Sequence, residues 1–246
     1  YKWRMKEAAE ICDEAVKRHP GSDGAKNCEQ LGKNLRGPRM NITTEKAVVP
    51  GKPFLAMVRS QNIKELFFRI VITDPEQYAD RLGNSSNEEI LAFLTGLPAA
   101  GSWNLIVPND GDLQSHSFES AMQPVPEGFY VLLVSTDETF NRKEAVTSHT
   151  PFWSTNISYI DRRNETGGID YYLLDRVTGL PVKEAVVEAW TRRYEYSQRK
   201  HVAGKTGDFA SDGNGFLTIP SAEDGRGNNQ VFLKIRHGRD YYVTDP

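Results

Sequence analysis

Two cysteines, Cys12 and Cys28, carry the most reactive side chains of this chain. They lie at nearly equal distances from a turn signal, His19-Pro20-Gly21-Ser22, which separates two segments with helical spacing of apolar residues. An antiparallel helical hairpin would bring the two thiols opposite each other, and in an oxidising compartment they could form a disulfide if their Cα atoms lie within about 7 Å. Two buried thiols are the alternative. A four-ligand zinc site is not expected, because no second pair of ligands lies nearby in the sequence.

Oxygen ligands of the kind that calcium prefers occur near the C-terminus, at Asp208, Asp212, Asn214 and Glu223. An EF-hand loop that began at Asp212 would place Leu217 where glycine is required. The order Asp212-Gly213-Asn214-Gly215 instead favours a tight hairpin turn, in which glycine and asparagine accept positive φ. We therefore predict no metal site in the chain.

Basic and aromatic residues are interleaved in one region, as they are in proteins that bind single-stranded nucleic acid. The region contains Arg192-Arg193-Tyr194-Glu195-Tyr196, Arg199, Lys200 and His201. The alternative is a long strand pair with one solvated face, where Lys and Arg discourage pairing with another chain. We favour this alternative and predict no nucleic-acid partner, because the formal net charge is −3 and nucleic-acid-binding proteins usually carry a basic excess.

Residue types that perform catalysis are scattered along the chain. None of the five histidines lies beside a serine or cysteine in a nucleophile motif. His116 and Glu119 would face opposite sides of a strand, and no glycine-rich phosphate loop leads from a strand into a helix. We therefore predict no enzyme, no catalytic residue and no cofactor.

Length and composition are those of a globular protein. The 246 residues are 38% hydrophobic and 26% charged, which allows one large domain or two of about 100 residues. The longest apolar run, Phe129 to Val134, is far shorter than the roughly 18 residues needed to cross a bilayer, so we predict no membrane-spanning segment. The chain opens at Tyr1 without a methionine or an apolar leader, and we expect it to be part of a longer protein.

The hydrophobic periodicity changes after residue 36. Residues 1–36 predict a helical hairpin, whose second helix begins at the capping residue Ser22 and places Ala25, Cys28, Leu31 and Leu35 on one face. This hairpin resembles the last unit of a tetratricopeptide-like array. From residue 37 the period is two, which predicts strands, interrupted by a short helix near 86–95 where Ser86 and Glu89 form a capping box.

Two β-sandwiches fit the length that remains. In the strand expected at 66–72, we predict that Leu66, Phe68, Ile70 and Ile72 share one face. The second half has about seven short strand candidates, at 152–160, 169–174, 182–193, 194–202, 215–219, 231–236 and 241–244. That number is typical of an immunoglobulin-like sandwich. We predict a mainly β chain with two immunoglobulin- or fibronectin-III-like sandwiches, at 37–147 and 148–246, after the hairpin at 1–36.

Several segments resemble the macroglobulin domains of bacterial alpha-2-macroglobulin-like proteins. In the second half they are Ser154-Thr-Asn-Ile-Ser-Tyr-Ile160, Tyr171-Tyr-Leu-Leu-Asp-Arg-Val-Thr-Gly-Leu-Pro-Val182, Ala185-Val-Val-Glu-Ala-Trp190 and Ser211-Asp-Gly-Asn-Gly-Phe-Leu-Thr-Ile-Pro220. Upstream segments resemble the preceding module of the Bacteroides-type branch of this family. They are Val49-Pro-Gly-Lys-Pro-Phe-Leu-Ala56, Asn62, Phe68-Arg69-Ile70 and Pro126-Glu-Gly-Phe-Tyr-Val-Leu-Leu133. The likeness covers residues 40–246.

This resemblance implies the amino-terminal region of an exported bacterial protein of the cell envelope, periplasmic or anchored to the outer membrane. It implies a broad-spectrum protease inhibitor in which a bait segment is cut and the protein closes around the protease. The present chain would be a non-catalytic scaffold. Its partners would be other macroglobulin domains of the parent chain and, through the full-length protein, the target proteases.

Members of this family that bind proteases covalently use a Cys-x-Glu-Gln thioester, which Asn27-Cys28-Glu29-Gln30 does not match. The glutamine follows the cysteine by two positions instead of three, and the family's thioester lies far downstream. Cys28 is better explained as an apolar residue on a helix face.

An alternative function is a carbohydrate- or protein-binding module of a surface nutrient-uptake system. Exposed aromatic residues would then stack on sugars: Trp153, Tyr171, Tyr172, Tyr194, Tyr196, Tyr241 and Tyr242. Aromatic residues that alternate in strands more often pack against the neighbouring strand.

Overall fold

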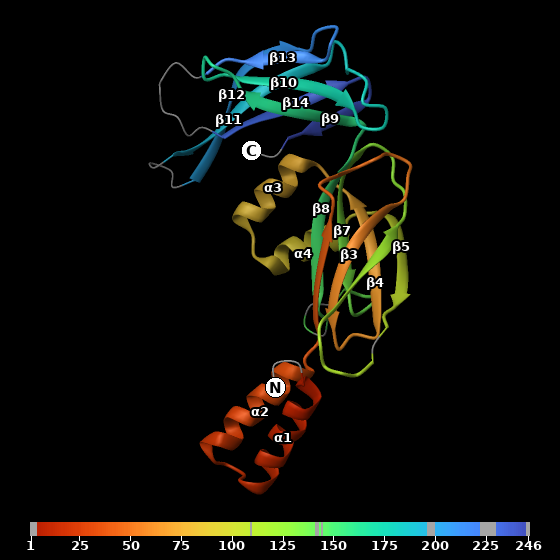
Figure 1. The fold of residues 1–246 in the computed structure, drawn as a ribbon, viewed down its shortest axis with the longest axis vertical. Helices are drawn as coiled ribbons and strands as arrows, with labels where there is room; N and C mark the ends of the chain where they lie inside the picture. The colour runs from red at the N-terminus through yellow and green to blue at the C-terminus, as the bar shows by residue number, and fades with distance from the viewer. Residues whose placement is uncertain are drawn as a thin grey trace. The chain divides into compact units, whose positions relative to one another are not determined.

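The computed structural model describes residues 4–108, 110–140, 143, 145–195, 200–221 and 230–244. It is mainly β after a helical start, which confirms the predicted fold class (Figure 1). The chain forms two compact units, the first made of Tyr1–Lys46, Pro53–Gln123 and Phe129–Phe152, and the second of Ala47–Lys52, Pro124–Gly128 and Trp153–Pro246. The domain boundaries after residues 36 and 147 stay a prediction.

The chain begins with a hairpin of two helices, α1 (Met5–Arg18) and α2 (Asp23–Arg36). α2 begins where the sequence predicts, because Ser22 Oγ accepts a hydrogen bond of 3.1 Å from the Ala25 N–H. Small side chains are buried between the helices, at Ala9, Cys12, Ala25 and Gly32. The prediction for Leu31 is wrong: this side chain is 46% exposed, since the buried position of that turn is taken by Gly32.

The first unit contains two facing sheets. One has the order β1-β3-β6, with β1 (Arg39–Thr44), β3 (Phe54–Gln61) and β6 (His116–Met122). The other has the order β8-β7-β4-β5, with β8 (Thr147–Ser154), β7 (Gly128–Ser135), β4 (Glu65–Ile72) and β5 (Ala99–Ile106). The short strand β2 (Ala47–Val48) pairs with Trp153 and Ser154, and these four residues belong to the second unit. Phe54 of one sheet contacts Phe152 of the other, with ring centroids 4.8 Å apart.

The strand β4 follows the predicted alternation over most of its length. Leu66, Phe68 and Ile70 are almost fully buried in the core between the sheets. Ile72 differs from the prediction and is 49% exposed. It follows an irregularity in the pairing with β5, between Ile70 and Val71, which interrupts the alternation.

Two helices cover the outer face of β7, the face turned away from the other sheet (Figure 1). The sequence predicts one of them, α4 (Asn87–Gly96), which begins with the expected capping box of Ser86 and Glu89. The other, α3 (Pro75–Asn84), is not predicted by the sequence pattern. Its N-cap Asp74 accepts a hydrogen bond of 2.9 Å from the Gln77 N–H. Tyr78 and Leu94 of these helices pack with Val131 and Leu133 of β7 in one buried cluster. The strand β7 is therefore buried on both faces.

The second unit is also built of two sheets. The order of one is β13-β10-β9, with β13 (Phe216–Ile219), β10 (Ile169–Asp175) and β9 (Ile157–Arg163). The order of the other is β12-β11-β14-β15, with β12 (Lys200–Ala210), β11 (Val186–Glu195), β14 (Gln230–His237) and β15 (Asp240–Val243). Tyr159 of β9 contacts Tyr242 of β15, with centroids 6.2 Å apart, so the sheets face each other.

Two strand predictions in this region are wrong in their extent. The single strand expected at 152–160 is divided, because β8 ends at Ser154 and β9 begins at Ile157. The strand expected at 194–202 instead begins at Lys200 and continues to Ala210 as β12, while β11 continues to Glu195.

Candidate functional site

The two cysteines lie together on the facing helices of the hairpin. Cys12 is buried and Cys28 is half-buried, and the pKa of the Cys12 thiol is raised by its burial and, to a smaller degree, by the neighbouring Cys28. Both are free thiols in the structure, and the disulfide stays a prediction. Gln30 does not turn towards Cys28, because its amide donates a hydrogen bond of 3.2 Å to Asn34 Oδ1.

The candidate calcium ligands do not surround a common point. Asp212 Oδ1 accepts hydrogen bonds of 2.8 Å from the N–H groups of Asn214 and Phe216, which is the geometry of the expected hairpin turn. Asp208 forms an ion pair of 2.6 Å with Lys205 instead. Glu223 lies outside the described residues.

Of the basic and aromatic region, the structure describes the side chain of Arg192, on β11. The Lys234 ammonium lies 4.1 Å from the centre of the Trp190 ring, and the Arg192 guanidinium lies 5.7 Å from that of Phe232. These cation–π contacts involve two rings outside the predicted region, so they do not test its own aromatic residues. The rest of the region lies outside the residues or side chains that are described, namely Arg193, Tyr194, Glu195, Tyr196, Arg199, Lys200 and His201.

Three of the seven aromatic residues proposed to stack on sugars are instead buried, and Tyr172 and Tyr241 are half-buried. Trp153, Tyr171 and Tyr242 are buried, and Trp153 contacts the ring of Tyr242 edge to face at 5.6 Å. Their expected exposure is therefore wrong, because cross-strand packing uses these rings. Tyr172 is half-buried and packs against Phe216. Tyr194 and Tyr196 lie outside the described side chains.

Carboxylates of the second unit bind the backbone of turns and strand ends. In the segment Asp175–Val182, Asp175 Oδ1 accepts hydrogen bonds from the N–H of Val177 and from both the N–H and the hydroxyl of Thr178 (2.7 and 2.8 Å for Thr178). The bond from the Thr178 N–H is the largest cause of the lowered pKa of Asp175. Gly179 follows with a φ of 70°, which closes the turn.

A second carboxylate holds the junction between β8 and β9. Asp240 accepts one hydrogen bond from the Thr155 hydroxyl (2.8 Å) and one from the Asn156 N–H (2.7 Å). Arg176 donates to the carbonyl oxygens of Thr155 and Ile157 from another direction. Burial raises the pKa of Asp240, although both hydrogen bonds act to lower it. This junction explains why one expected strand is two.

Among the described residues, one group of side chains has the composition of a metal site. The ligand atoms of Asp110, Asp112 and His116 lie within 4.8 Å of one another on the surface. His116 Nε2 bonds to Asp112 Oδ1 (3.0 Å), and this bond lowers the pKa of Asp112 and raises that of His116. This group is not among the predicted sites, although the spacing Asp-x-Asp-x₃-His in the sequence is a signal for it. The bond between the two side chains accounts for their arrangement.

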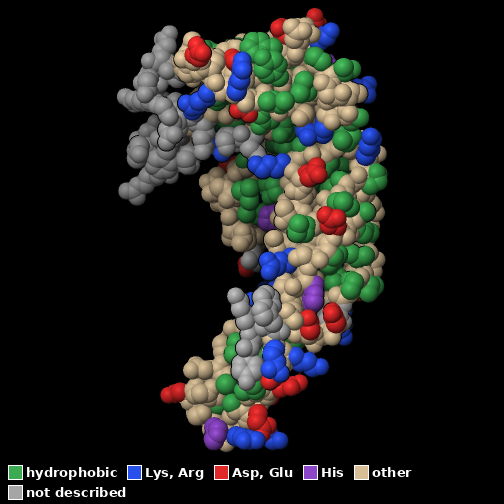
Figure 2. All heavy atoms as spheres, in the orientation of Figure 1, with side chains coloured by type: hydrophobic (Ala, Val, Ile, Leu, Met, Phe, Trp, Pro, Cys, Tyr) green, Lys and Arg blue, Asp and Glu red, His purple; other side chains and the backbone are tan. Residues whose placement is uncertain are grey.

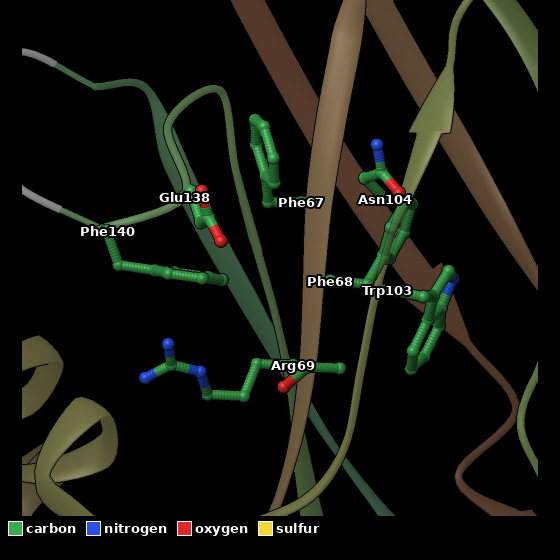
Figure 3. A pocket seen from close by; sticks show the side chains of 8 residues that line it. Phe67, Phe68, Arg69, Trp103, Asn104, Glu138 and Phe140 are labelled. Carbon is green, nitrogen blue, oxygen red and sulfur yellow. The ribbon is translucent and has the colours of Figure 1, made fainter.

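A pocket of about 350 Å³ lies on the face of β4 and β5 opposite the core between the sheets. Phe67 and Arg69 come from β4, Ser102 and Asn104 from β5, and Glu138 and Phe140 from the loop after β7. Figure 3 shows Phe67, Arg69, Glu138 and Phe140 around one opening, while the Trp103 ring points away from it. The Trp103 ring stacks on Phe68 instead.

Arg69 is the polar group of this pocket with spare capacity for hydrogen bonds. Its guanidinium carbon lies 4.6 Å from the centre of the Phe140 ring, and Nη1 donates a long hydrogen bond of 3.4 Å to the Thr95 carbonyl. Nε is buried and has no partner among the described residues. A buried donor without a partner is costly, and a ligand in the pocket does not reach this one. The other N–H groups of the guanidinium can donate to an oxygen atom of a ligand that has an apolar body.

Comparisons with known proteins give only distant likenesses. No protein-family model and no curated protein matches the chain. Similar solved structures include a mutant of Salmonella alpha-2-macroglobulin (10% identity, 85% of this chain and 16% of that chain, TM-score 0.35). Others are Escherichia coli alpha-2-macroglobulin activated by porcine elastase (12% identity, 84% and 23%, TM-score 0.25) and red sea bream transglutaminase (10% identity, 92% and 33%, TM-score 0.36).

The chain spans a third or less of the length of each of these structures. Their TM-scores are too low to carry an argument, so the fold class given above depends on the order and pairing of the strands. Among the described residues, no helix combines the length and the apolar character needed to cross a membrane.

Proposed function

We propose that the chain is a non-catalytic β-sandwich scaffold of an alpha-2-macroglobulin-like, broad-spectrum protease inhibitor. The sequence resemblance over residues 40–246 supports the choice of family. One structural observation supports the scaffold role: carboxylates of the second unit bond to the backbone of turns and strand ends, at Asp175, Asp212 and Asp240. Carboxylates that hold turns and strand ends by hydrogen bonds make the β-sandwich rigid.

In this proposal the frame fixes the positions of neighbouring domains while a bait segment elsewhere is cut. The contacts around Asp240 and Arg176 suit that role, because they hold residues 155–157 in place within the second unit by bonds of 2.7 to 3.0 Å. The partners would be other macroglobulin domains and, through them, the captured proteases. The proposal also includes a Bacteroides-type parent protein, with this chain near its amino terminus, exported to the bacterial cell envelope.

The test compares the 246-residue chain with the full-length product of its gene. Each is incubated with serine, cysteine and metalloproteases, and the digestion of casein and of a small peptide substrate is measured. We expect the full-length protein to suppress the digestion of casein and to spare the peptide, because an enclosed protease still admits a small substrate. The chain alone should change neither rate.

Scaffold variants in the full-length protein sharpen this test. Gly215→Ala, which disturbs the sandwich, should weaken the suppression of casein digestion, whereas Gly213→Ala in the same turn should preserve it. Inhibition of a range of proteases by the chain alone would refute the scaffold role. Unhindered casein digestion by all the proteases in the presence of the full-length protein would refute the family assignment.

A protein- or carbohydrate-binding module is the second candidate, and the pocket at Arg69 favours it. Screening the chain on glycan and peptide arrays tests this function. Binding that is lost in Arg69→Ala but kept in Arg59→Ala, an exposed arginine on β3, would support it. Arrays without any bound ligand would leave the scaffold role as the better account.

A further inference from the structure

The two thiols of the helical hairpin differ in their access to solvent. Cys12 is 4% exposed, whereas Cys28 is half-buried and lines an open pocket of about 410 Å³ between α1 and α2. Acidic and basic side chains line the same pocket, namely Asp13, Lys17, Glu29, Lys33 and Arg36. Figure 2 shows charged groups of both signs on the visible surface of the hairpin. A small polar molecule can therefore reach Cys28 but not Cys12.

The packing of the helices keeps the two sulfur atoms together. The small residues Ala9, Ala25 and Gly32 let the helices approach closely. An ion pair between Arg36 of α2 and Asp13 of α1 closes one side of the thiol pair. Cys28 also contributes to the raised pKa of Cys12, which indicates that the two side chains are neighbours. A disulfide requires their sulfur atoms to approach to roughly 2 Å.

We propose that Cys12 and Cys28 form a dithiol site for low-molecular-weight disulfides, in which Cys28 reacts first and Cys12 second. In the first step the Cys28 thiolate attacks one sulfur of the small disulfide, whose S–S bond breaks. A mixed disulfide forms on Cys28, and the first thiolate leaves and takes up the proton that Cys28 lost.

In the second step the Cys12 thiolate attacks Cys28 Sγ and displaces the second small thiolate, which takes up the proton of Cys12. The two cysteines lose two electrons in total, and the small disulfide is reduced to two thiols. Burial raises the pKa of Cys12, which disfavours its thiolate and slows the second step. The mixed disulfide on Cys28 is therefore a transient species that can be observed.

The resulting bond joins two helices across one short turn. It closes the loop from residue 12 to residue 28, which restricts the unfolded chain and opposes separation of α1 from α2. The site does not depend on the function proposed above, because it uses only residues of the hairpin.

The experiment uses the reduced 246-residue chain and glutathione disulfide as the probe. Samples are acid-quenched over time, alkylated, and analysed as intact protein and as peptides by mass spectrometry. We expect an early glutathione adduct on Cys28, followed by a product that has lost about 2 Da, the two thiol hydrogens. The oxidised chain should keep its helical circular dichroism signal to a higher urea concentration than the reduced chain.

Two matched variants separate the roles of the cysteines. Cys12→Ser should accumulate the adduct on Cys28, and Cys28→Ser should react many-fold more slowly at Cys12. The cysteine that carries the first glutathione adduct is identified in the unmutated chain, so the result does not depend on whether a variant folds. The proposal is overturned if the first adduct lies on Cys12 or if Cys28 links two chains. It is also overturned if the folded chain stays reduced while the chain unfolded in guanidinium is oxidised.

Discussion

Gly215 occupies a position where a side chain would meet backbone on the central strand of a sheet. Its φ is 73°, and a Cβ atom there would lie 2.3 Å from the carbonyl oxygen of Leu173. That carbonyl accepts a hydrogen bond of 2.9 Å from the Val182 N–H, and the carbonyl of Gly215 accepts one of 2.7 Å from the Leu173 N–H. The substitution Gly215→Ala must therefore move backbone that is bonded on two sides.

The expected cost has a torsional and a steric part. A left-handed backbone costs alanine about 1–2 kcal/mol, and the lower entropy of the unfolded chain returns about 0.4–1 kcal/mol. The displacement of the Leu173 backbone weakens two hydrogen bonds in a buried strand, at about 1 kcal/mol each. We expect Gly215→Ala to lower the free energy of unfolding by about 2–4 kcal/mol.

Two other glycines serve as matched controls. Gly179 has a φ of 70° with nothing within 4 Å of an added Cβ, so Gly179→Ala measures the torsional part alone. Gly213 has open space and no positive φ, so Gly213→Ala should be neutral or slightly stabilising. Urea unfolding monitored by tryptophan fluorescence and circular dichroism gives the three values. If Gly215→Ala costs no more than Gly179→Ala, the close approach to Leu173 does not exist and the packing described for this turn is wrong.

Three further predictions concern the helices, a turn and a half-buried histidine. Leu94→Ala should cost about 2–5 kcal/mol, because Leu94 is fully buried between α4 and β7, whereas Leu82→Ala, at a position 49% exposed on α3, should cost under about 1 kcal/mol. Equal urea midpoints for these two variants would contradict the packing of the helices on the sheet. Asp175→Ala should lower the urea midpoint at pH 7. The folded state lowers the pKa of Asp175, so this carboxylate stabilises the fold above about pH 4 and the stabilisation is lost as the pH falls through the folded pKa. The urea midpoints of the unmutated chain and of Asp175→Ala should therefore converge at low pH. A difference between these midpoints that stays constant down to pH 2.5 would contradict this. Burial lowers the pKa of His149, whose ring contacts Tyr78. Protonation of His149 then favours the unfolded chain as the pH falls below about 6.5. Between pH 7.5 and 5.5 the free energy of unfolding should therefore fall more in the unmutated chain than in His149→Phe. Parallel pH profiles of the two proteins would show that His149 is not buried in its neutral form.

Local signals in the sequence identify most of the elements. The caps at Ser22 and Ser86 lie where they are predicted, because a cap depends on a side chain and an N–H group three residues apart. α3 was missed although Asp74-Pro75 is a helix start signal, since only Tyr78 of its short apolar pattern is buried. β1 was missed because its apolar residues are only Met40 and Ile42.

Whether a candidate site can be predicted from the sequence depends on how far apart its residues lie in the chain. Cys12 and Cys28 are joined by one short turn, so their proximity is readable from the spacing. In the pocket at Arg69, alternation along β4 places Phe67 and Arg69 on one face. It gives no position for Glu138 and Phe140, which a loop brings from about seventy residues further along.

Sequence separation also decides which polar contacts can be anticipated. Asp175 binds Thr178 three residues away, and its turn is evident from Asp-x-x-Thr-Gly. Asp240 binds Thr155 across 85 positions, and nothing in the residues around either one indicates the other. Yet this distant contact determines where β8 ends and β9 begins, because a carboxylate that accepts the Asn156 N–H removes that group from any strand pairing. An apolar alternation alone predicts one continuous strand at 152–160, and a single buried aspartate 84 residues from Asn156 is enough to divide it.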